Sequence, residues 1–319
     1  MLLCLFLGCS SLNAQFISTI AGNGTYGSAG NGGPAIAAQV ETPSKIVVSA
    51  NGDIYFAEYN NNIIRKITAS TGIITTICGQ RGLGTYSGDG GPAIVATFRH
   101  IKGMAVDVIG NIYFSDSPNH RIRKITASTG IITTICGTGS AYGSAGGFSG
   151  DGGLATAATI SFPSGIAVGS TGDIYFCDSQ NNRVRKITAS TGIITTICGN
   201  GASATFPYVG VNGGLATVAI IGKPLAIALD PNENIYIGLE LSVCKITANT
   251  GIINIITGNN TFSSGDGHPA TSVTIGIGSL TDFGNICIDA DDNVYISNRY
   301  IKLTQIYTFA VYFLLHSAS

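Results

Sequence analysis

One segment recurs five times along the chain at nearly constant spacing. In the third copy it reads Gly-Asp-Ile-Tyr-Phe at 172–176, and its Ile or Val falls at positions 54, 112, 174, 235 and 294. The successive spacings are 58, 62, 61 and 59 residues. A fixed period of this size is typical of solenoids and propellers, in which each repeat buries its hydrophobic face against its neighbours. The repeat therefore constrains the fold more than any other feature of the sequence.

Within one period the sequence predicts four short β-strands. In the third copy they fall at 165–168, 174–177, 183–187 and 193–199. Each run is rich in β-branched or aromatic residues and is bounded by Gly, Asn or Asp, which is typical of strands. Four antiparallel strands make a propeller blade, and a ring of blades leaves only short exposed edges. We therefore expect an all-β propeller of four-stranded antiparallel blades, with five blades visible and six possible if the chain is incomplete.

The two ends of the repeat region predict how the ring closes. Residues 17–22 match the fourth strand at 73–79, whereas the last repeat shows three strands and no recognisable fourth. We expect the N-terminal strand to complete the last blade and close the ring. The propeller then occupies residues 15–306, and residues 307–319 form a divergent C-terminal tail.

The first fourteen residues predict a leader. They are rich in Leu and Phe and end in a small residue, Ala14, which resembles a signal-peptidase site and makes Gln15 the mature start. A lipoprotein cleavage box at Cys9 and an unprocessed apolar strand are the alternatives. Formal net charge is −1, so no basic excess attracts nucleic acid or an anionic membrane surface. We expect a secreted, monomeric chain with no nucleic-acid partner and no membrane span.

Six cysteines follow the leader. Cys78, Cys136 and Cys198 share one repeat position at the end of the fourth strand. In neighbouring blades they should lie beyond the roughly 7 Å Cα–Cα limit of a disulfide. The other three fall on other strands, one in each blade: Cys177, Cys244 and Cys287. We expect six small buried apolar side chains and no disulfide framework.

A polar hairpin with the pattern Asp-x-x-Asn-x-Arg joins the second and third strands. Two copies are complete, and the first copy matches in part: Asp116/Asn119/Arg121, Asp178/Asn181/Arg183 and Asn61/Ile64/Arg65. Asp and Asn side chains satisfy backbone donors in tight turns, and the Arg can return to the carboxylate as a charge-assisted pair. Because a residue repeated in each blade usually serves the blade, we favour this structural role over ligand contact.

A Gly-rich insert follows the fourth strand. Three copies carry an Asp, and two carry an Asn instead: Asp89, Asp151, Asp266, Asn31 and Asn212. One carboxylate per loop is too few for Ca²⁺, which takes about six to eight oxygen ligands. A turn and a one-turn helix, with Pro at its first position and Asp or Asn near its cap, explain the residues without a metal.

Propeller strand order places these inserts on the same face as the hairpins. That face carries the length and variation of the repeats, so it is our hypothesis for the binding surface. Its candidate binding residues are Asp89, Asp151, Asp266, Asn119 and Asn181.

These motifs resemble the NHL-repeat family of β-propellers. The resemblance rests on Pro-x-Gly-Ile-Ala-Val at 163–168, Gly-Asp-Ile-Tyr-Phe-x-Asp at 172–178 and Asn-x-Arg-Val-Arg-Lys-Ile at 181–187. The insert at 87–93 resembles that of extracellular and bacterial members with long repeats. The resemblance covers residues 17 to 306 and implies a propeller, commonly of six blades. It specifies function poorly, because one fold carries many functions.

The same family suggests catalytic alternatives. A lyase that cleaves peptidyl-hydroxyglycine holds a central zinc with several His, and such a zinc needs about three converging ligands. The four histidines here occupy unrelated repeat positions: His100, His120, His268 and His316. Acidic residues end three first strands near the channel, as the metal ligands of lactonase-like propellers do: Asp107, Asp230 and Asp289. Ser49 and Gly169 replace them in two copies.

The sequence therefore favours an extracellular scaffold that binds a protein or a glycan through the insert-bearing face. We expect no catalytic residues, no cofactor and no metal. A metal-dependent lactonase-like or lyase-like enzyme with its site in the central channel is the alternative.

Overall fold

The computed structural model describes residues 18–139, 146–203, 211–240, 242–258, 285–289 and 292–298, together with the backbone of a strand at 310–314. The predicted leader, its mature start and residue 17 lie outside the described residues. Within those residues no helix is long and apolar enough to cross a membrane.

The described chain forms five antiparallel sheets, which we call blades 1 to 5. Blade 1 consists of β1 (Pro43–Val48), β2 (Ile54–Glu58), β3 (Ile63–Ile67) and β4 (Ile74–Cys78). Blade 2 consists of β5 (Ile101–Val106), β6 (Ile112–Asp116), β7 (Arg121–Ile125) and β8 (Ile132–Cys136). Blade 3 consists of β9 (Pro163–Val168), β10 (Ile174–Asp178), β11 (Arg183–Ile187) and β12 (Ile194–Cys198).

Blades 4 and 5 depart from this plan at their edges. Blade 4 adds a short outer strand and consists of β13 (Gly214–Leu215), β14 (Ala226–Leu229), β15 (Ile235–Gly238), β16 (Val243–Ile246) and β17 (Ile252–Thr257). Blade 5 consists of β18 (Ile286–Ile288), β19 (Val294–Asn298) and β20 (Ala310–Leu314). The predicted all-β fold of four-stranded antiparallel sheets is confirmed, and in blade 3 the observed strands match the predicted ones within two residues.

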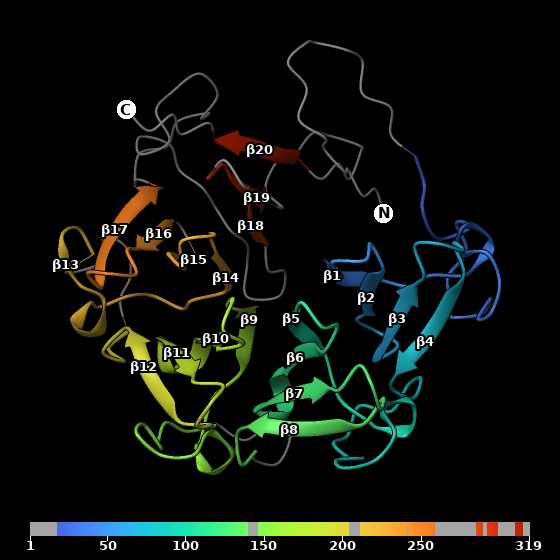
Figure 1. Cartoon of the computed structure of the whole chain (residues 1–319), viewed down its shortest axis with the longest axis horizontal. Helices are drawn as coiled ribbons and strands as arrows, with labels where there is room; N and C mark the ends of the chain where they lie inside the picture. Colours follow the sequence, from blue (N-terminus) through green and yellow to red (C-terminus); the bar gives the residue numbers. More distant parts are fainter. Residues whose placement is uncertain are drawn as a thin grey trace.

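The first strand of each blade lies at the centre of the molecule (Figure 1), and these inner strands contact one another in the order β1, β5, β9, β14, β18. Hydrophobic clusters fill the space between neighbouring blades. Ala57 and Ile64 of blade 1, for example, belong to one cluster with Phe98 and Phe114. The inner strands approach so closely that a Cβ on Gly103 would lie 2.9 Å from the Ile166 amide nitrogen. The repeat is therefore stabilised by its neighbours, as its periodicity predicts.

The N-terminal segment lies against blade 1. Gly22 donates its N–H to Ala35 O at 3.0 Å, just as Gly79 does to Ala93 O at 3.1 Å at the end of a fourth strand. Gly22 thus stands where a preceding blade's fourth strand would end. Among the described residues, however, Ser18 to Gly22 pair with no strand, so the predicted pairing with the last blade is not seen.

The C-terminal end adds a strand that the sequence did not predict. β20 pairs with β19 and lies within residues 307–319, which the sequence predicts to be a divergent tail beyond the propeller. At least five residues of that segment therefore belong to the last sheet.

The Gly-rich inserts follow a path different from the expected one. Gly90 donates to Ile132 O at 2.8 Å, and Ile132 donates back to Gly91 O at 3.0 Å. The segment therefore covers the outer strand β8 and protects a sheet edge. The prediction that it lies on the same face as the hairpins is wrong for the Gly-Asp-Gly-Gly segment, because the chain first crosses the blade's outer edge and only then returns to the inner strand.

Each described insert continues into a short 3₁₀ turn. The turns are η1 (Ala35–Ala37), η2 (Ala93–Val95), η4 (Ala155–Ala157) and η6 (Ala216–Val218). Pro92 precedes η2 as its N-cap and no side chain caps the turn, so the predicted capping by Asp or Asn is wrong. Two further turns, η3 (Ser117–Asn119) and η5 (Ser179–Asn181), lie in hairpins.

The six cysteines that the structure describes are all free thiols. Five are buried, and burial raises the pKa of thiols such as Cys78. Cys287 is exposed, so the prediction that all six are buried is wrong for this residue. It lies on β18, between the buried Ile286 and the half-buried Ile288.

Candidate functional site

The insert aspartates form ion pairs with buried arginines. Arg123 has a fully buried side chain, and its Nη2 lies 2.8 Å from Asp89 Oδ1 while its Nη1 lies 3.7 Å from Asp116 Oδ2. Arg185 of blade 3 is also fully buried, and its Nη2 lies 2.6 Å from Asp151 Oδ1. Each arginine thereby ties an insert to the hairpin of the blade that it leads into. Two of the candidate binding residues thus stabilise the blade; Asp266 lies outside the described residues.

The hairpin asparagines also bond within their own blades. Asn119 Nδ2 donates to Asp116 Oδ1 at 2.7 Å, and Asn181 Nδ2 donates to Asp178 Oδ2 at 2.8 Å. The expected return of Arg121 to Asp116 is wrong. Arg121 donates to two backbone carbonyls and stacks on the ring of Tyr86, with its guanidinium carbon 3.6 Å from the ring centroid.

Burial dominates the electrostatics of this hairpin. The pKa of Asp116 is raised to about 6, because desolvation outweighs the amide of Arg99, the side chain of Asn119 and the charge of Arg123. A buried carboxylate in a polar network of this kind stabilises its surroundings only while every partner is present.

The acidic residues that end first strands are capping groups. Asp107 Oδ1 accepts from the Asn111 amide at 2.8 Å, and its Oδ2 accepts from Asn111 Nδ2 and from the Tyr113 hydroxyl at 3.1 Å. Asp230 and Asp289 receive the same set of bonds from their own turns. A metal ion would have to displace these donors. No group of three or more metal-ligating side chains occurs in the part of the chain that the structure describes.

The two described histidines serve separate blade junctions. His100 stacks on Tyr59 with ring centroids 4.1 Å apart. His120 accepts a hydrogen bond from the Phe162 amide at Nδ1, at 3.1 Å, and packs against that residue's ring. His268 and His316 lie outside the described residues.

A cationic cluster lies where the inner strands begin, at the end of the molecule that carries the hairpins. Lys45 is 7% exposed, and its Nζ donates to Asn285 Oδ1 at 2.7 Å, which links the inner strands of blades 1 and 5. Burial, followed by the charge of Lys102, lowers the pKa of Lys45 to about 8, and burial lowers that of Lys102 to about 8. Both side chains therefore remain cationic at neutral pH.

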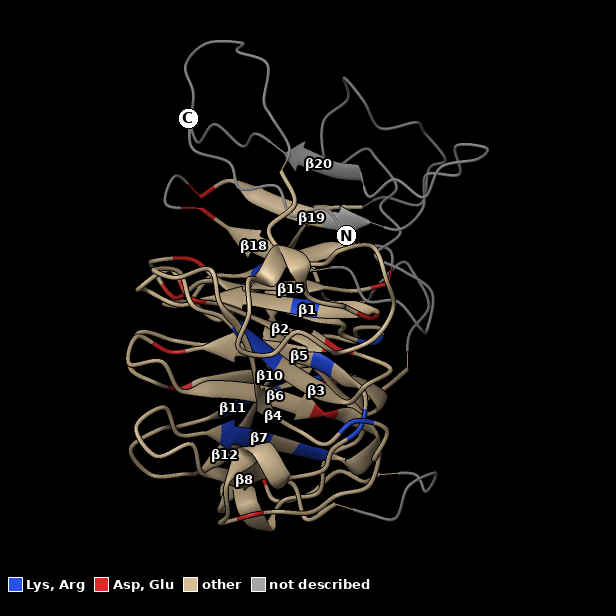
Figure 2. Ribbon diagram, turned by 90° about the vertical axis from the view of Figure 1, so that its right-hand side faces the viewer, with Lys and Arg blue, Asp and Glu red and all other residues tan. Residues whose placement is uncertain are grey.

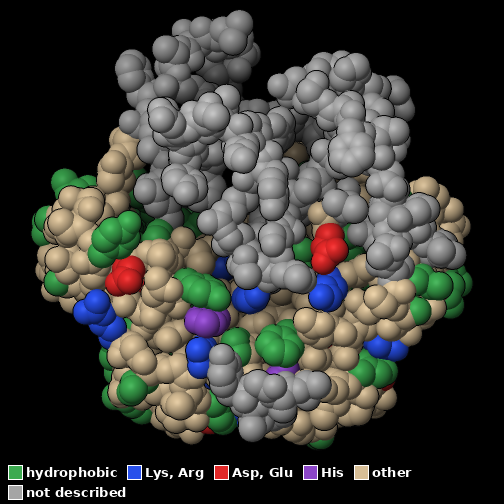
Figure 3. Space-filling view, turned by 180° about the vertical axis from the view of Figure 1, so that it is seen from behind, with side chains coloured by type: hydrophobic (Ala, Val, Ile, Leu, Met, Phe, Trp, Pro, Cys, Tyr) green, Lys and Arg blue, Asp and Glu red, His purple; other side chains and the backbone are tan. Residues whose placement is uncertain are grey.

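Two further groups lie in this region. Arg99 precedes β5, and its charge and that of Lys102 lower the pKa of His100 after the larger effect of burial, so this imidazole is neutral at pH 7. We call Lys45, Arg99 and Lys102 the cationic cluster, and His100 lies beside it. Figure 3 shows a face on which Lys or Arg, His and hydrophobic side chains lie together near the centre. In side view, Asp and Glu recur in the loops along the left edge of the molecule, and a few others lie nearer the middle and the right (Figure 2).

Sequence reasoning missed these lysines, although the repeat contained a sign of them. Strand register aligns Lys45 with Gly103, Gly165 and Ala226 of the next three blades. Lys45 therefore departs from the Gly or Ala of blades 2 to 4, and its partner Asn285 holds the equivalent position in blade 5. Shifted pKa values together with such a departure indicate a functional position.

The fold and its repeats define the class of this protein as a β-propeller repeat protein. Residues 145–210 match the family described as Teneurin NHL domain. The chain is 30% identical over 248 residues to Teneurin-3 of Danio rerio, covering 73% of this chain and 8% of the relative. It is 24% identical over 162 residues to NHL repeat-containing protein 2 of Bos taurus, covering 48% of this chain and 22% of the relative.

This chain belongs to the NHL-repeat β-propellers. It spans less than a quarter of the length of the curated relatives named above. Among solved structures, a protein of unknown function from Bacteroides thetaiotaomicron aligns with a TM-score of 0.48 and 18% identity, covering 88% of this chain and 72% of that one.

Proposed function

We propose that this NHL-type propeller is a secreted, non-catalytic scaffold that binds an acidic glycan or an acidic protein segment through its hairpin face. The hairpin face is the end of the molecule that carries the turns between the second and third strands of the blades. The observation that carries the proposal is the cationic cluster. Lys45 and Lys102 hold their charges in a desolvated position, where an anion is attracted more strongly than at an exposed surface.

The remainder of the chain supports local rather than general attraction. Net charge is −1, so binding of anions through a basic surface as a whole is not expected. The Tyr59–His100 stack offers a flat aromatic surface beside the charges. Aromatic rings with a polar edge are suited to sites that are partly apolar and partly wet.

The proposal moves the binding residues from the inserts to the inner strands. Asp89 and Asp151 are engaged by buried arginines, so they hold the scaffold in shape. The hairpin face stays the proposed surface, and the Gly-Asp-Gly-Gly segments are excluded from it. We also propose that the N-terminal strand closes the ring, because Gly22 already takes the place of a fourth-strand end beside blade 1.

The test compares binding of the full chain to immobilised sulfated or uronic-acid oligosaccharides, to acidic peptides and to neutral counterparts. We expect acidic ligands to bind, with affinity falling as salt rises. Lys45→Met/Lys102→Met should abolish binding, while Lys124→Met/Lys186→Met, which removes the same charge from the other face, should retain it. Equal binding by both double variants, or equal binding of neutral ligands, would overturn the proposal.

A further inference from the structure

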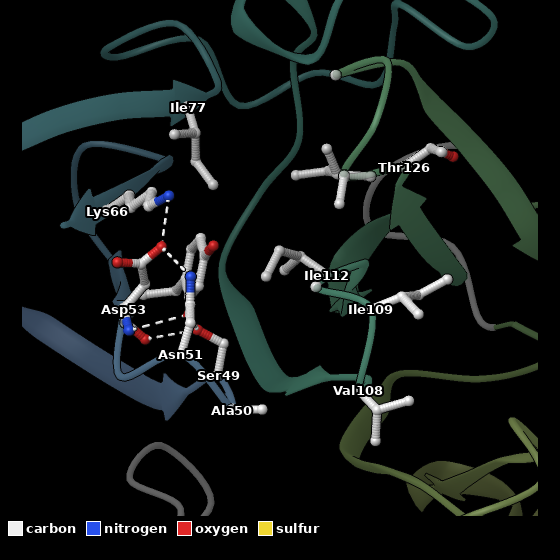
Figure 4. A pocket seen from close by; sticks show the side chains of 15 residues that line it. Ser49, Ala50, Asn51, Asp53, Lys66, Ile77, Val108, Ile109, Ile112 and Thr126 are labelled. Atoms are coloured by element: carbon white, nitrogen blue, oxygen red, sulfur yellow. Dashed lines mark hydrogen bonds and ion pairs between the residues drawn. The ribbon is translucent and has the colours of Figure 1, made fainter. Parts of the chain in front are cut away.

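A cavity of about 500 Å³ opens between blades 1 and 2. It lies on the turn face, which we define by the turns that join first to second and third to fourth strands. On the blade 1 side Asp53 pairs with Lys66 at 2.6 Å and accepts from Asn51 Nδ2 at 3.0 Å (Figure 4). The opposite wall is apolar and includes Val108 and Ile109. Cavities of this volume commonly hold small molecules.

The corresponding space between blades 3 and 4 contains a carboxylate from the chain itself. Glu233 Oε1 accepts a hydrogen bond from the Ser170 amide, across the junction, at 2.7 Å. Glu233 occupies the left-handed position of its turn, with φ of 62°. The residue at this turn position in blade 2 is Gly110, with φ of 91°. Blade 2 therefore lacks the side chain that reaches across the junction in blade 4.

The donor that Glu233 uses has a counterpart in the open cavity. Strand and turn register align Ala50 of blade 1 with Ser170 of blade 3. Ala50 lines the cavity, and its N–H meets no acceptor within the described residues. A backbone donor facing a cavity is suited to an oxygen acceptor.

The charges of the two junctions match at equivalent positions. Blades 1 and 2 contribute Asp53, Lys66, Asp107 and Lys124, and blades 3 and 4 contribute Asp173, Lys186, Asp230 and Lys245. Glu233 adds one negative charge to the second set only. The same set of charges thus accommodates a carboxylate in one junction and lacks it in the other.

The apolar wall is also peculiar to blade 2. Val108 and Ile109 lie in a turn, and these large apolar side chains are 83% and 74% exposed. The equivalent pairs elsewhere are small or polar: Ala50 and Asn51, Ser170 and Thr171, Pro231 and Asn232. Turn chemistry does not require two large apolar side chains here, whereas an apolar ligand would bury them.

We propose that the cavity between blades 1 and 2 binds a small organic carboxylate with an apolar substituent. Its carboxylate accepts from the Ala50 N–H beside Lys66, and its apolar part packs on Val108 and Ile109. Ser49 stands where the other junction has Gly169. A Cβ on Gly169 would lie 2.6 Å from Glu233 Oε2, so the Ser49 side chain occupies space that the Glu233 carboxylate uses in the other junction. The ligand therefore sits farther from the turn than the Glu233 carboxylate does.

The test uses hexanoate as the probe and hexanamide as its neutral counterpart. The full chain is labelled with ¹⁵N-alanine, and the Ala50 signal is identified by its loss in Ala50→Ser. We expect hexanoate to shift this signal in a saturable manner and hexanamide to leave it in place. A peptide ending in a free Leu carboxylate, compared with its amide, shows whether a chain terminus can supply the same group.

Matched variants separate a specific site from weak surface binding. Gly110→Asp places an acid at the cavity and should weaken hexanoate binding at least tenfold, whereas the isosteric Gly110→Asn, with the same backbone strain, should weaken it less than threefold. Val108→Ser should weaken hexanoate binding but leave acetate binding unchanged. Glu233→Gly should open a second carboxylate site at the junction of blades 3 and 4, which binds hexanoate more weakly than the first because this junction lacks the apolar wall. The proposal would be overturned if hexanoate gave no saturable shift up to about 50 mM, a concentration well above a dissociation constant of about 1 mM. It would also be overturned if Gly110→Asp and Gly110→Asn weakened binding equally.

Discussion

Replacing Arg123 with Met tests whether the insert and the hairpin are joined by a buried ion pair. The guanidinium is fully buried and contacts two carboxylates, Asp89 at 2.8 Å and Asp116 at 3.7 Å. It also donates to the carbonyls of Ser87 at 3.0 Å and Thr97 at 3.4 Å. Methionine fills much of the volume but supplies none of these donors.

The magnitude follows from what the variant leaves behind. Asp116 is fully buried, so without Arg123 its charge is uncompensated, and breaking a buried pair in this way costs about 3–5 kcal/mol. The bonds give a similar figure, since two neutral acceptors contribute about 1 kcal/mol each and a charged one about 1.5–3. A loss of this size is a large fraction of the 5–15 kcal/mol by which a domain is typically stable.

The assay is urea unfolding followed by far-UV circular dichroism, with unfolding free energies compared at equal m-values. Arg121→Met is the matched control, because the Arg121 guanidinium donates to two backbone carbonyls and stacks on Tyr86. We expect it to cost about 1 kcal/mol. A loss below about 1 kcal/mol for Arg123→Met, or an equal loss for both variants, would refute the reasoning, because neither is compatible with an uncompensated buried charge.

Three further outcomes are expected. Because the pKa of Lys45 is lowered in the folded chain, this group binds more protons in the unfolded state between pH 8 and 10.5, so it contributes a rise in unfolding free energy of up to about 1.4 kcal/mol per pH unit; the difference in unfolding free energy between the wild type and Lys45→Met should therefore grow in favour of the wild type across this window, and a constant difference would contradict it. Gly103→Ala should destabilise by about 1–3 kcal/mol, because its Cβ would meet the Ser164 carbonyl and the Ile166 amide, whereas Gly33→Ala should change little in the same melts; equal losses would be the opposing result. Among the six described cysteines, Cys287 should react first with an alkylating reagent in the native chain, as read by peptide mass mapping, and faster labelling of Cys78 would argue against the burial described.

The fold was predictable because it is local and repeated. The strand at 183–187, for instance, carries its own β-propensity and turn residues, and its neighbours in the sheet are also its neighbours in sequence. The sequence predicted the wrong arginine, Arg121 in place of Arg123, as the ion-pair partner of Asp116. Arg121 and Arg123 lie two apart on one strand and therefore share a face with Asp116, and only the position of the insert, about thirty residues away in sequence, decides which one is buried.

The site was less predictable than the fold, for a related reason. Sequence reasoning valued residues that repeat, such as Asp89 and Asp151, and the structure gives these to the scaffold. The cationic cluster and the blade 1–blade 2 cavity depend instead on positions that break the repeat, such as Lys45 and Val108. Comparing the copies for departures, in addition to matches, would have found both.

The central claim is that Lys45 and Lys102 form a desolvated anion-binding site, and the most direct measurement is their pKa with and without a ligand. Titrating ¹³C-lysine-labelled chain by NMR, with the two signals assigned from the Met variants, should give pKa values near 8 in the free chain. A saturating sulfated oligosaccharide should raise both, because a nearby anion favours the charged form. Values near the ordinary 10.5 in the free chain, or no change on adding acidic ligands, would contradict the account.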